Sequence, residues 1–141
     1  MLARQVRPSP ELIASGLILR RTSARSHRWL LLRGAKHREW GFPKGHQEPH
    51  ETLLATALRE CAEETGIGLV AIEGAPLELH YSVPSGRSKR AVYFPAVTSC
   101  LDIELSDEHS AGGWFIREVV LERLVHANMR ALFLAYLRGL A

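Results

Sequence analysis

Short apolar runs separated by polar or glycine-containing turns dominate the chain and predict strands. We expect strands at 14–21, 29–33, 68–74, 77–83, 90–98 and 112–116. The first two flank the polar segment TSARSHR and predict an antiparallel pair. Pro95 lacks an amide hydrogen, so the strand that contains it should lie at a sheet edge or carry a bulge.

Helical periodicity appears in three other segments. The pattern predicts a central helix over residues 50–65 with Gly66 as its stop, and two closing helices at 117–125 and 128–140. The segment 34–50 is rich in glycine and proline and predicts a loop. Strands precede and follow the central helix, which predicts an α/β fold with a mixed sheet between helices.

Length and composition limit the class of protein. A chain of 141 residues that is 46% hydrophobic and 23% charged fits one domain, residues 1–141. No apolar run approaches the roughly 18 residues that span a bilayer, so we expect no membrane segment. Cys61 and Cys100 form neither a metal-binding spacing nor a disulfide framework, which favours a reducing, cytoplasmic compartment. The net charge of +3 permits an anionic partner without requiring one, and we predict no stable nucleic-acid partner.

Glutamates concentrate on the central helix. A wheel at about 100° per residue predicts a core face and an opposite carboxylate face. The core face is Leu54, Ala57, Leu58, Cys61 and Thr65, and the opposite face is Glu60, Glu63 and Glu64. Like charges three or four residues apart repel, and the helix C-terminus disfavours negative charge. The cluster is either a solvated charged face or a site for a hard divalent cation, Mg²⁺ or Mn²⁺, with Arg59 orienting a carboxylate.

The spacing of these residues resembles a known family. Gly45, Glu51, Arg59, Glu60, Glu63, Glu64 and Gly66, followed by the aliphatic Ile67, match the box of the Nudix hydrolases, with Cys61 at a usually aliphatic position. The resemblance implies an α/β/α sandwich and hydrolysis of a P–O–P bridge by a metal-bound water. It implies metal ligation by Glu60, Glu63, Glu64 and the carbonyl of Gly45, orientation of a catalytic carboxylate by Arg59, and support from Glu51.

Flanking segments are similar to the diadenosine tetraphosphate hydrolases of that family. WGFPKGHQEPHE at 40–51 matches their pattern except that His50 replaces a glycine, and LSDEH at 105–109 with a later tryptophan also matches. The resemblance makes Glu108 a candidate metal ligand or base, against the alternative of a turn residue. Lys44 and Lys89 are candidate phosphate contacts. Trp40, Tyr81 and Tyr93 become candidate substrate contacts, the tyrosines by stacking on adenine. The alternatives are that Trp40 packs the loop and that the tyrosines pack in the core.

These observations predict a metal-dependent pyrophosphohydrolase that splits diadenosine tetraphosphate asymmetrically into ATP and AMP. The cofactor would be Mg²⁺, with Mn²⁺ as the alternative, and the partner a small-molecule nucleotide or other diphosphate. One alternative is another substrate: a nucleoside triphosphate, a diphosphoinositol polyphosphate or an RNA 5′ end. A second alternative is a non-catalytic nucleotide-binding module. Whether Glu60 or a glutamate outside the box is the base stays open.

Overall fold

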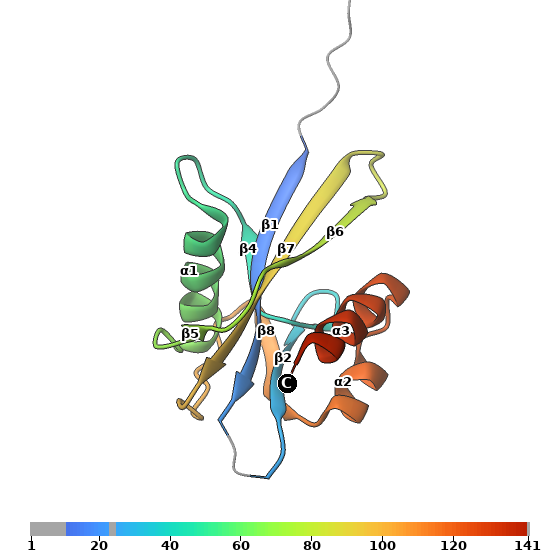
Figure 1. Cartoon of the computed structure of the whole chain (residues 1–141). Helices are drawn as coiled ribbons and strands as arrows, with labels where there is room; N and C mark the ends of the chain where they lie inside the picture. Colours follow the sequence, from blue (N-terminus) through green and yellow to red (C-terminus); the bar gives the residue numbers. More distant parts are fainter. Residues whose placement is uncertain (1–10, 23–24, 141) are drawn as a thin grey trace, which may run out of the picture.

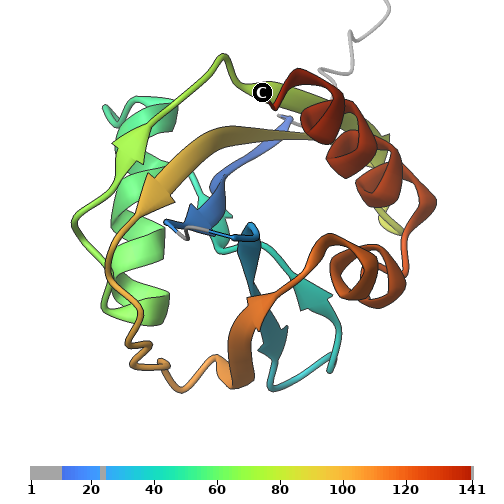
Figure 2. The same cartoon turned by 60° about the horizontal axis from the view of Figure 1, so that its bottom comes forward.

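A mixed β-sheet forms the middle layer of the computed structural model, which describes residues 11–22 and 25–140 (Figure 1). The strands are β1 Leu12–Arg21, β2 Arg28–Gly34, β3 Trp40–Gly41, β4 Lys44–His46, β5 Ala71–Ile72, β6 Leu77–Ser82, β7 Ser88–Thr98 and β8 His109–Phe115. The helices are α1 Leu53–Thr65, α2 Arg117–Arg123 and α3 Ala127–Gly139. Figure 2 shows α1 on one side of the sheet and α2 with α3 on the other, which confirms the α/β/α arrangement.

The long strands β1 and β7 form the centre of the sheet. They run parallel over the whole register from Leu12↔Lys89 to Arg21↔Thr98. β2 and β4 pair antiparallel with β1, and β5 and β6 pair antiparallel with β7. The sheet is therefore mixed, and the predicted pairing of the first two strands is confirmed.

Two apolar cores lie on the two faces of this sheet. Residues in β1 alternate between them: Leu17 and Leu19 face α1, whereas Ile18 faces α2 and α3. Both sides of a central strand are buried, so β1 is an almost continuous apolar run. Cys61 is 0% exposed and packs in the α1-side core as a small hydrophobic side chain.

Some element predictions differ from the structure. The predicted loop 34–50 contains the short strands β3 and β4, and the predicted strand 68–74 is reduced to β5. Pro95 lies in a central strand, so the edge prediction is wrong. The Pro95 carbonyl accepts a hydrogen bond from the Glu73 amide, which lies between the end of β5 and the start of β6. Because the neighbouring strand is interrupted there, the sheet tolerates a residue without an amide hydrogen.

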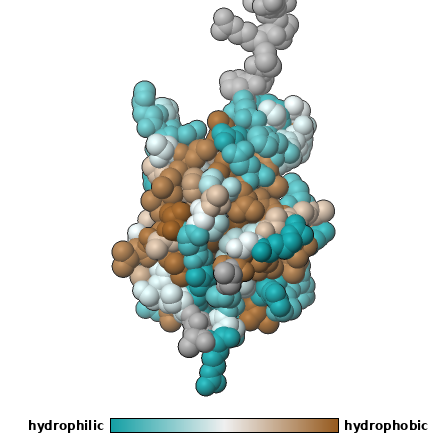
Figure 3. All heavy atoms as spheres, viewed as in Figure 1, coloured by the Kyte–Doolittle hydropathy of each residue, from teal (hydrophilic) through white to brown (hydrophobic). Residues whose placement is uncertain are grey.

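The surface of the view in Figure 1 is uneven in polarity. Figure 3 shows hydrophilic surface at the top, over the loop before α1 and the β6–β7 hairpin, and apolar surface across the middle. The apolar side chains that reach the surface include Leu69 and Leu101, which are 74% and 50% exposed. In residues 11–22 and 25–140, no helix is both long and apolar enough to cross a membrane.

Candidate active site

Helix α1 is bounded by two local signals that fix the position of its glutamates. Thr52 is the N-cap, and its hydroxyl accepts from the amide of Ala55 at 3.1 Å. Gly66 ends the helix with φ 76°, a left-handed conformation that glycine adopts without steric cost. The predicted stop at Gly66 is confirmed, and the helix begins at Leu53 rather than residue 50.

Arg59 and Glu51 join the helix to the loop before it. Arg59 donates from Nε and Nη2 to the two carboxylate oxygens of Glu51, at 2.7 and 3.0 Å. Glu51 also accepts from the Thr56 hydroxyl at 2.6 Å and from the Glu48 amide at 3.1 Å. These donors, Arg59 first, lower the pKa of Glu51 to about 2. Glu51 is therefore ionised at neutral pH and holds the loop against α1.

Arg59 also reaches a second carboxylate. Its Nη1 donates to Glu60 Oε1 at 2.9 Å, and its Nη2 donates to the backbone carbonyl of His46 at 3.1 Å. Gly45 lies directly beside Glu60: a Cβ added at Gly45 would stand 1.9 Å from the Glu60 Cδ. A side chain at Gly45 would displace the Glu60 carboxylate, so the contact between β4 and this carboxylate depends on the absence of a side chain.

Glu64 departs from the sequence prediction. It is 4% exposed, and residues seven apart on an α-helix lie on nearly the same side, so Glu64 shares the side of Ala57 rather than the opposite face. Leu54, predicted on the core face, is 36% exposed. Burial, followed by the charge of Glu60, raises the pKa of Glu64 to about 8. The Lys44 amide donates to Glu64 Oε2 at 3.3 Å and opposes this rise.

Glu63 lies apart from the other two helix glutamates. Its side chain is 58% exposed and accepts from Arg59 Nη1 at 3.3 and 3.4 Å. Across the described residues, no three carboxylate, imidazole or thiol groups stand close enough to form a ready metal site. The structure thus brings Glu60 and Glu64 together beside Gly45 and leaves Glu63 on Arg59.

Glu108 lies on a loop that returns to the C-terminal end of α1. The Glu104 amide donates to the Thr65 carbonyl at 2.8 Å and the Ser106 amide to the Glu64 carbonyl at 3.3 Å. Glu108 immediately precedes β8, and its charge contributes to the raised pKa of Glu64. The loop therefore holds the exposed Glu108 carboxylate within electrostatic reach of Glu64.

Two lysines approach each other near the same end of the sheet. Lys44 is in β4 and Lys89 is in β7, on the two sides of β1. Burial, followed by the positive charge of Lys44, lowers the pKa of Lys89. Two ammonium groups that repel each other favour an anion between them. Sequence reasoning proposed each lysine singly and missed their proximity, because the two strands pair only through β1.

The three predicted aromatic contacts have different surroundings. Tyr93 is 1% exposed, and its ring centroid lies 5.9 Å from that of Phe42. It is therefore a core residue, and the prediction that it stacks on adenine is wrong for this arrangement. Tyr81 is half-buried and pairs across the strands with Lys89. Trp40 packs edge-on against Phe115, with the Arg123 guanidinium 4.4 Å from its ring centroid.

Two polar side chains flank Glu108, one in its loop and one at the start of β8. The Ser106 hydroxyl and His109 Nδ1 are inaccessible to solvent and have no hydrogen-bond partner within the described residues. Burial lowers the pKa of His109. The sequence contains no periodic signal for the burial of single polar atoms such as these.

Comparison with known proteins decides the family. The NUDIX domain model matches residues 11–136, most of the chain. The chain belongs to the Nudix hydrolase family. A solved Caenorhabditis elegans Ap4A hydrolase, described as a binary complex, superposes on this Nudix chain with a TM-score of 0.81 at 30% identity. The match covers 92% of this chain and 99% of the C. elegans chain.

Several curated relatives of this Nudix chain are asymmetrical bis(5′-nucleosyl)-tetraphosphatases. The asymmetrical bis(5′-nucleosyl)-tetraphosphatase of C. elegans is 32% identical over 134 residues, 89% of this chain and 96% of the relative. The Rattus norvegicus protein of that name is 45% identical over 80 residues, 53% of this chain. The matched segment spans 54% of that rat relative, about half its length.

Proposed function

We propose that this Nudix chain hydrolyses a P–O–P bridge of dinucleoside polyphosphates and splits diadenosine tetraphosphate asymmetrically into ATP and AMP. The observation that carries the reaction class is the convergence of Glu60 and Glu64 beside Gly45, with Glu108 close by. The substrate assignment is supported by the C. elegans tetraphosphatase, with which the chain aligns over 89% of its length. The Lys44–Lys89 pair supplies positive charge for a polyphosphate.

The type of these side chains suits a divalent cation, which Nudix hydrolases generally use. Hard cations prefer oxygen ligands, and the raised pKa of Glu64 reflects burial and crowded negative charge that a cation would neutralise. Glu60, Glu63, Glu64, Glu108 and the Gly45 carbonyl would hold Mg²⁺, with Mn²⁺ as the alternative. Bound there, the ion would lower the pKa of water and neutralise charge on the leaving phosphate.

The chain's own residues position the substrate and move one proton. A water oxygen forms a bond to one phosphorus while the bridging P–O bond breaks and its electron pair leaves with the departing phosphate. Glu60 or Glu108 accepts the proton from that water. Arg59, fixed by Glu51, orients Glu60 for this role. Lys44 and Lys89 contact phosphate oxygens, and Tyr81 stacks on an adenine.

The test is product analysis with the purified chain. We expect diadenosine tetraphosphate with Mg²⁺ to yield ATP and AMP in equal amounts, resolved by chromatography. Chelator should stop the reaction, and added Mg²⁺ should restore it. Release of two ADP molecules would contradict asymmetric cleavage. Faster turnover of a nucleoside triphosphate, a diphosphoinositol polyphosphate or an RNA 5′ end would overturn the assignment of diadenosine tetraphosphate as the substrate. Binding without any product would instead indicate a nucleotide-binding module.

A further inference from the structure

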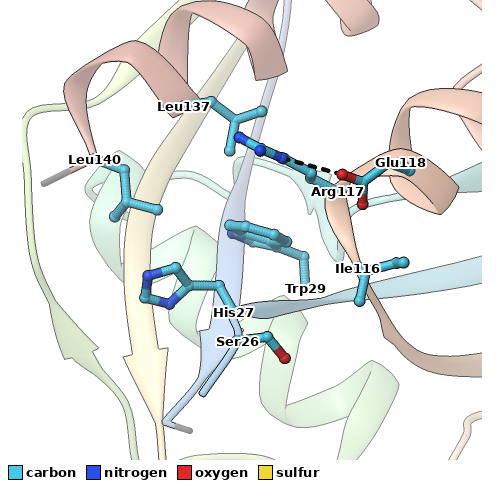
Figure 4. Close-up of a pocket in the computed structure, with 8 residues that line it drawn as sticks. All are labelled: Ser26, His27, Trp29, Ile116, Arg117, Glu118, Leu137 and Leu140. Carbon is cyan, nitrogen blue, oxygen red and sulfur yellow. Dashed lines mark hydrogen bonds and ion pairs between the residues drawn. The ribbon is translucent and has the colours of Figure 1, made fainter. Parts of the chain in front are cut away.

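A pocket of about 440 Å³ opens beside the β1–β2 hairpin, α2 and the C-terminal end of α3 (Figure 4). Its volume lies in the range of small-molecule sites, roughly 300–1,000 Å³. Its lining includes Ser26, His27, Trp29, Arg117, Leu137 and Leu140. In Figure 4 Trp29 lies at the centre of this group, and we call the cavity the Trp29 pocket.

Trp29 lies under the Trp29 pocket and is only 2% exposed, so the apolar surface comes from the side chains around it. The Trp29 indole N–H donates to the Tyr136 hydroxyl at 3.0 Å, so its polar atom is already satisfied. Leu137 and Leu140 come from the end of α3 on the other side. The half-buried His27 ring, 5.8 Å from that of Trp29, supplies a flat surface. A ligand with a flat apolar ring fits between His27 and these leucines.

The polar groups of the lining are mainly donors. Arg117 is 63% exposed and pairs with Glu118 at 3.3 Å, which leaves other N–H groups of its guanidinium for a ligand. His27 Nδ1 lies 3.3 Å from Arg20 Nη1. Arginine only donates, so Nδ1 accepts and neutral His27 carries its proton on Nε2. A guanidinium and an imidazole N–H thus border one cavity.

Hydrogen-bond donors, rather than net charge, favour an acidic group in the Trp29 pocket. Glu118 is a carboxylate of the lining and is already paired with Arg117. Arg20 lies against His27, but Glu73 holds it in a bidentate ion pair. A ligand carboxylate would therefore accept hydrogen bonds from Arg117 and His27, which an ammonium group cannot do.

The Trp29 pocket is separate from the carboxylate cluster. Trp29 packs in the core on the α2 and α3 side of the sheet, whereas the glutamates are carried by α1 on the opposite side. None of its residues takes part in the proposed hydrolysis. We propose that the Trp29 pocket is a second ligand site, which takes a small organic anion with a flat apolar ring and one acidic group.

Trp29 itself is the reporter for the test. The chain has three tryptophans, so the ¹⁵N-labelled protein shows a small set of indole N–H signals, assigned through Trp40→Phe and Trp114→Phe. Indole-3-acetate supplies the ring with a carboxylate, and tryptamine supplies the same ring with an ammonium. We expect indole-3-acetate to shift the Trp29 signal with a dissociation constant of about 1 mM or lower. Tryptamine should bind at least about tenfold more weakly.

Matched variants separate this site from general charge effects. Arg117→Glu should weaken indole-3-acetate at least about tenfold, whereas Arg138→Glu, the same change on the exposed side of α3, should leave it unchanged. Ser26→Phe should fill the cavity and abolish the shift while other signals keep their positions. No movement of the Trp29 signal at about 10 mM, equal binding of tryptamine, or equal losses in both arginine variants would overturn the proposal.

Discussion

Arg59 is the residue on which the geometry of the carboxylates depends. It donates to Glu51 on the loop, to the carbonyl of His46 at the end of β4 and to Glu60 on its own helix. A planar guanidinium can hold several acceptors in fixed directions, which a lysine cannot do. The contact between Gly45 and Glu60 completes this arrangement, because no side chain separates β4 from the carboxylate.

We expect Glu60→Gln to lower kcat at least about 10²-fold in Mg²⁺, because the amide keeps the shape and removes the charge. Steady-state hydrolysis of diadenosine tetraphosphate measures the effect. Glu122→Gln, on the exposed surface of α2, is the matched control and should retain full activity. Near-normal turnover by Glu60→Gln would remove Glu60 from the proposed site.

Of the two tyrosines predicted to stack on adenine, Tyr81 is accessible and Tyr93 is buried. If it stacks on a base, Tyr81→Ala should weaken nucleotide binding by about 1–3 kcal/mol, whereas Tyr81→Phe keeps the ring and should bind normally. Calorimetric titration with a non-hydrolysable dinucleotide measures both. Unchanged affinity in Tyr81→Ala would assign Tyr81 to packing against the α3-side core, where it already makes contacts.

At the scale of elements, α1 holds the site because both of its ends are fixed. Thr52 caps the start, and the end is tied to the Glu108 loop through the Glu104 amide and the Thr65 carbonyl. Gly66 turns the chain at this junction, and a Cβ there would lie 3.3 Å from the Glu104 Cβ. The end of the helix and the approach of Glu108 therefore depend on the same glycine.

Gly66→Ala should lower the free energy of unfolding by about 1 kcal/mol or more, since alanine is strained at φ 76°. Urea unfolding followed by circular dichroism measures the change. Gly68→Ala is the matched control, because a Cβ there meets nothing within 4 Å. A loss in Gly68→Ala as large as in Gly66→Ala would show that the left-handed turn is not the cause.

At the scale of the whole molecule, the hydrophobic periodicity predicted the α/β/α layers. The spacing of the Nudix box predicted the position of the glutamate helix. The burial of Glu64 was missed although its seven-residue spacing from Ala57 contained the signal. The two-residue strand β3 is too short to show a period. The direction of Glu63 and the Trp29 pocket arise from side-chain conformations and from packing between distant segments, which one sequence does not specify.

The buried Glu64 carboxyl predicts how the stability of the metal-free protein depends on pH. Its pKa rises from about 4.5 to about 8 on folding, so between these values the folded chain holds a proton that the unfolded chain has released. The contribution of Glu64 is full below the lower value and is lost as pH rises through the upper one. A tenfold difference in proton affinity between the folded and unfolded chains corresponds to about 1.4 kcal/mol, so the loss amounts to a few kcal/mol.

Glu64→Gln removes this titration and identifies its source. In chelator, the wild type should lose a few kcal/mol more than Glu64→Gln between about pH 5 and 8.5, measured by urea unfolding. The lowered pKa of Glu51 acts in the opposite direction, because its contribution is lost as pH falls toward about 2. That loss lies largely below the interval measured and is common to both proteins. Equal pH dependence of the two proteins would mean that Glu64 is not buried as a neutral acid.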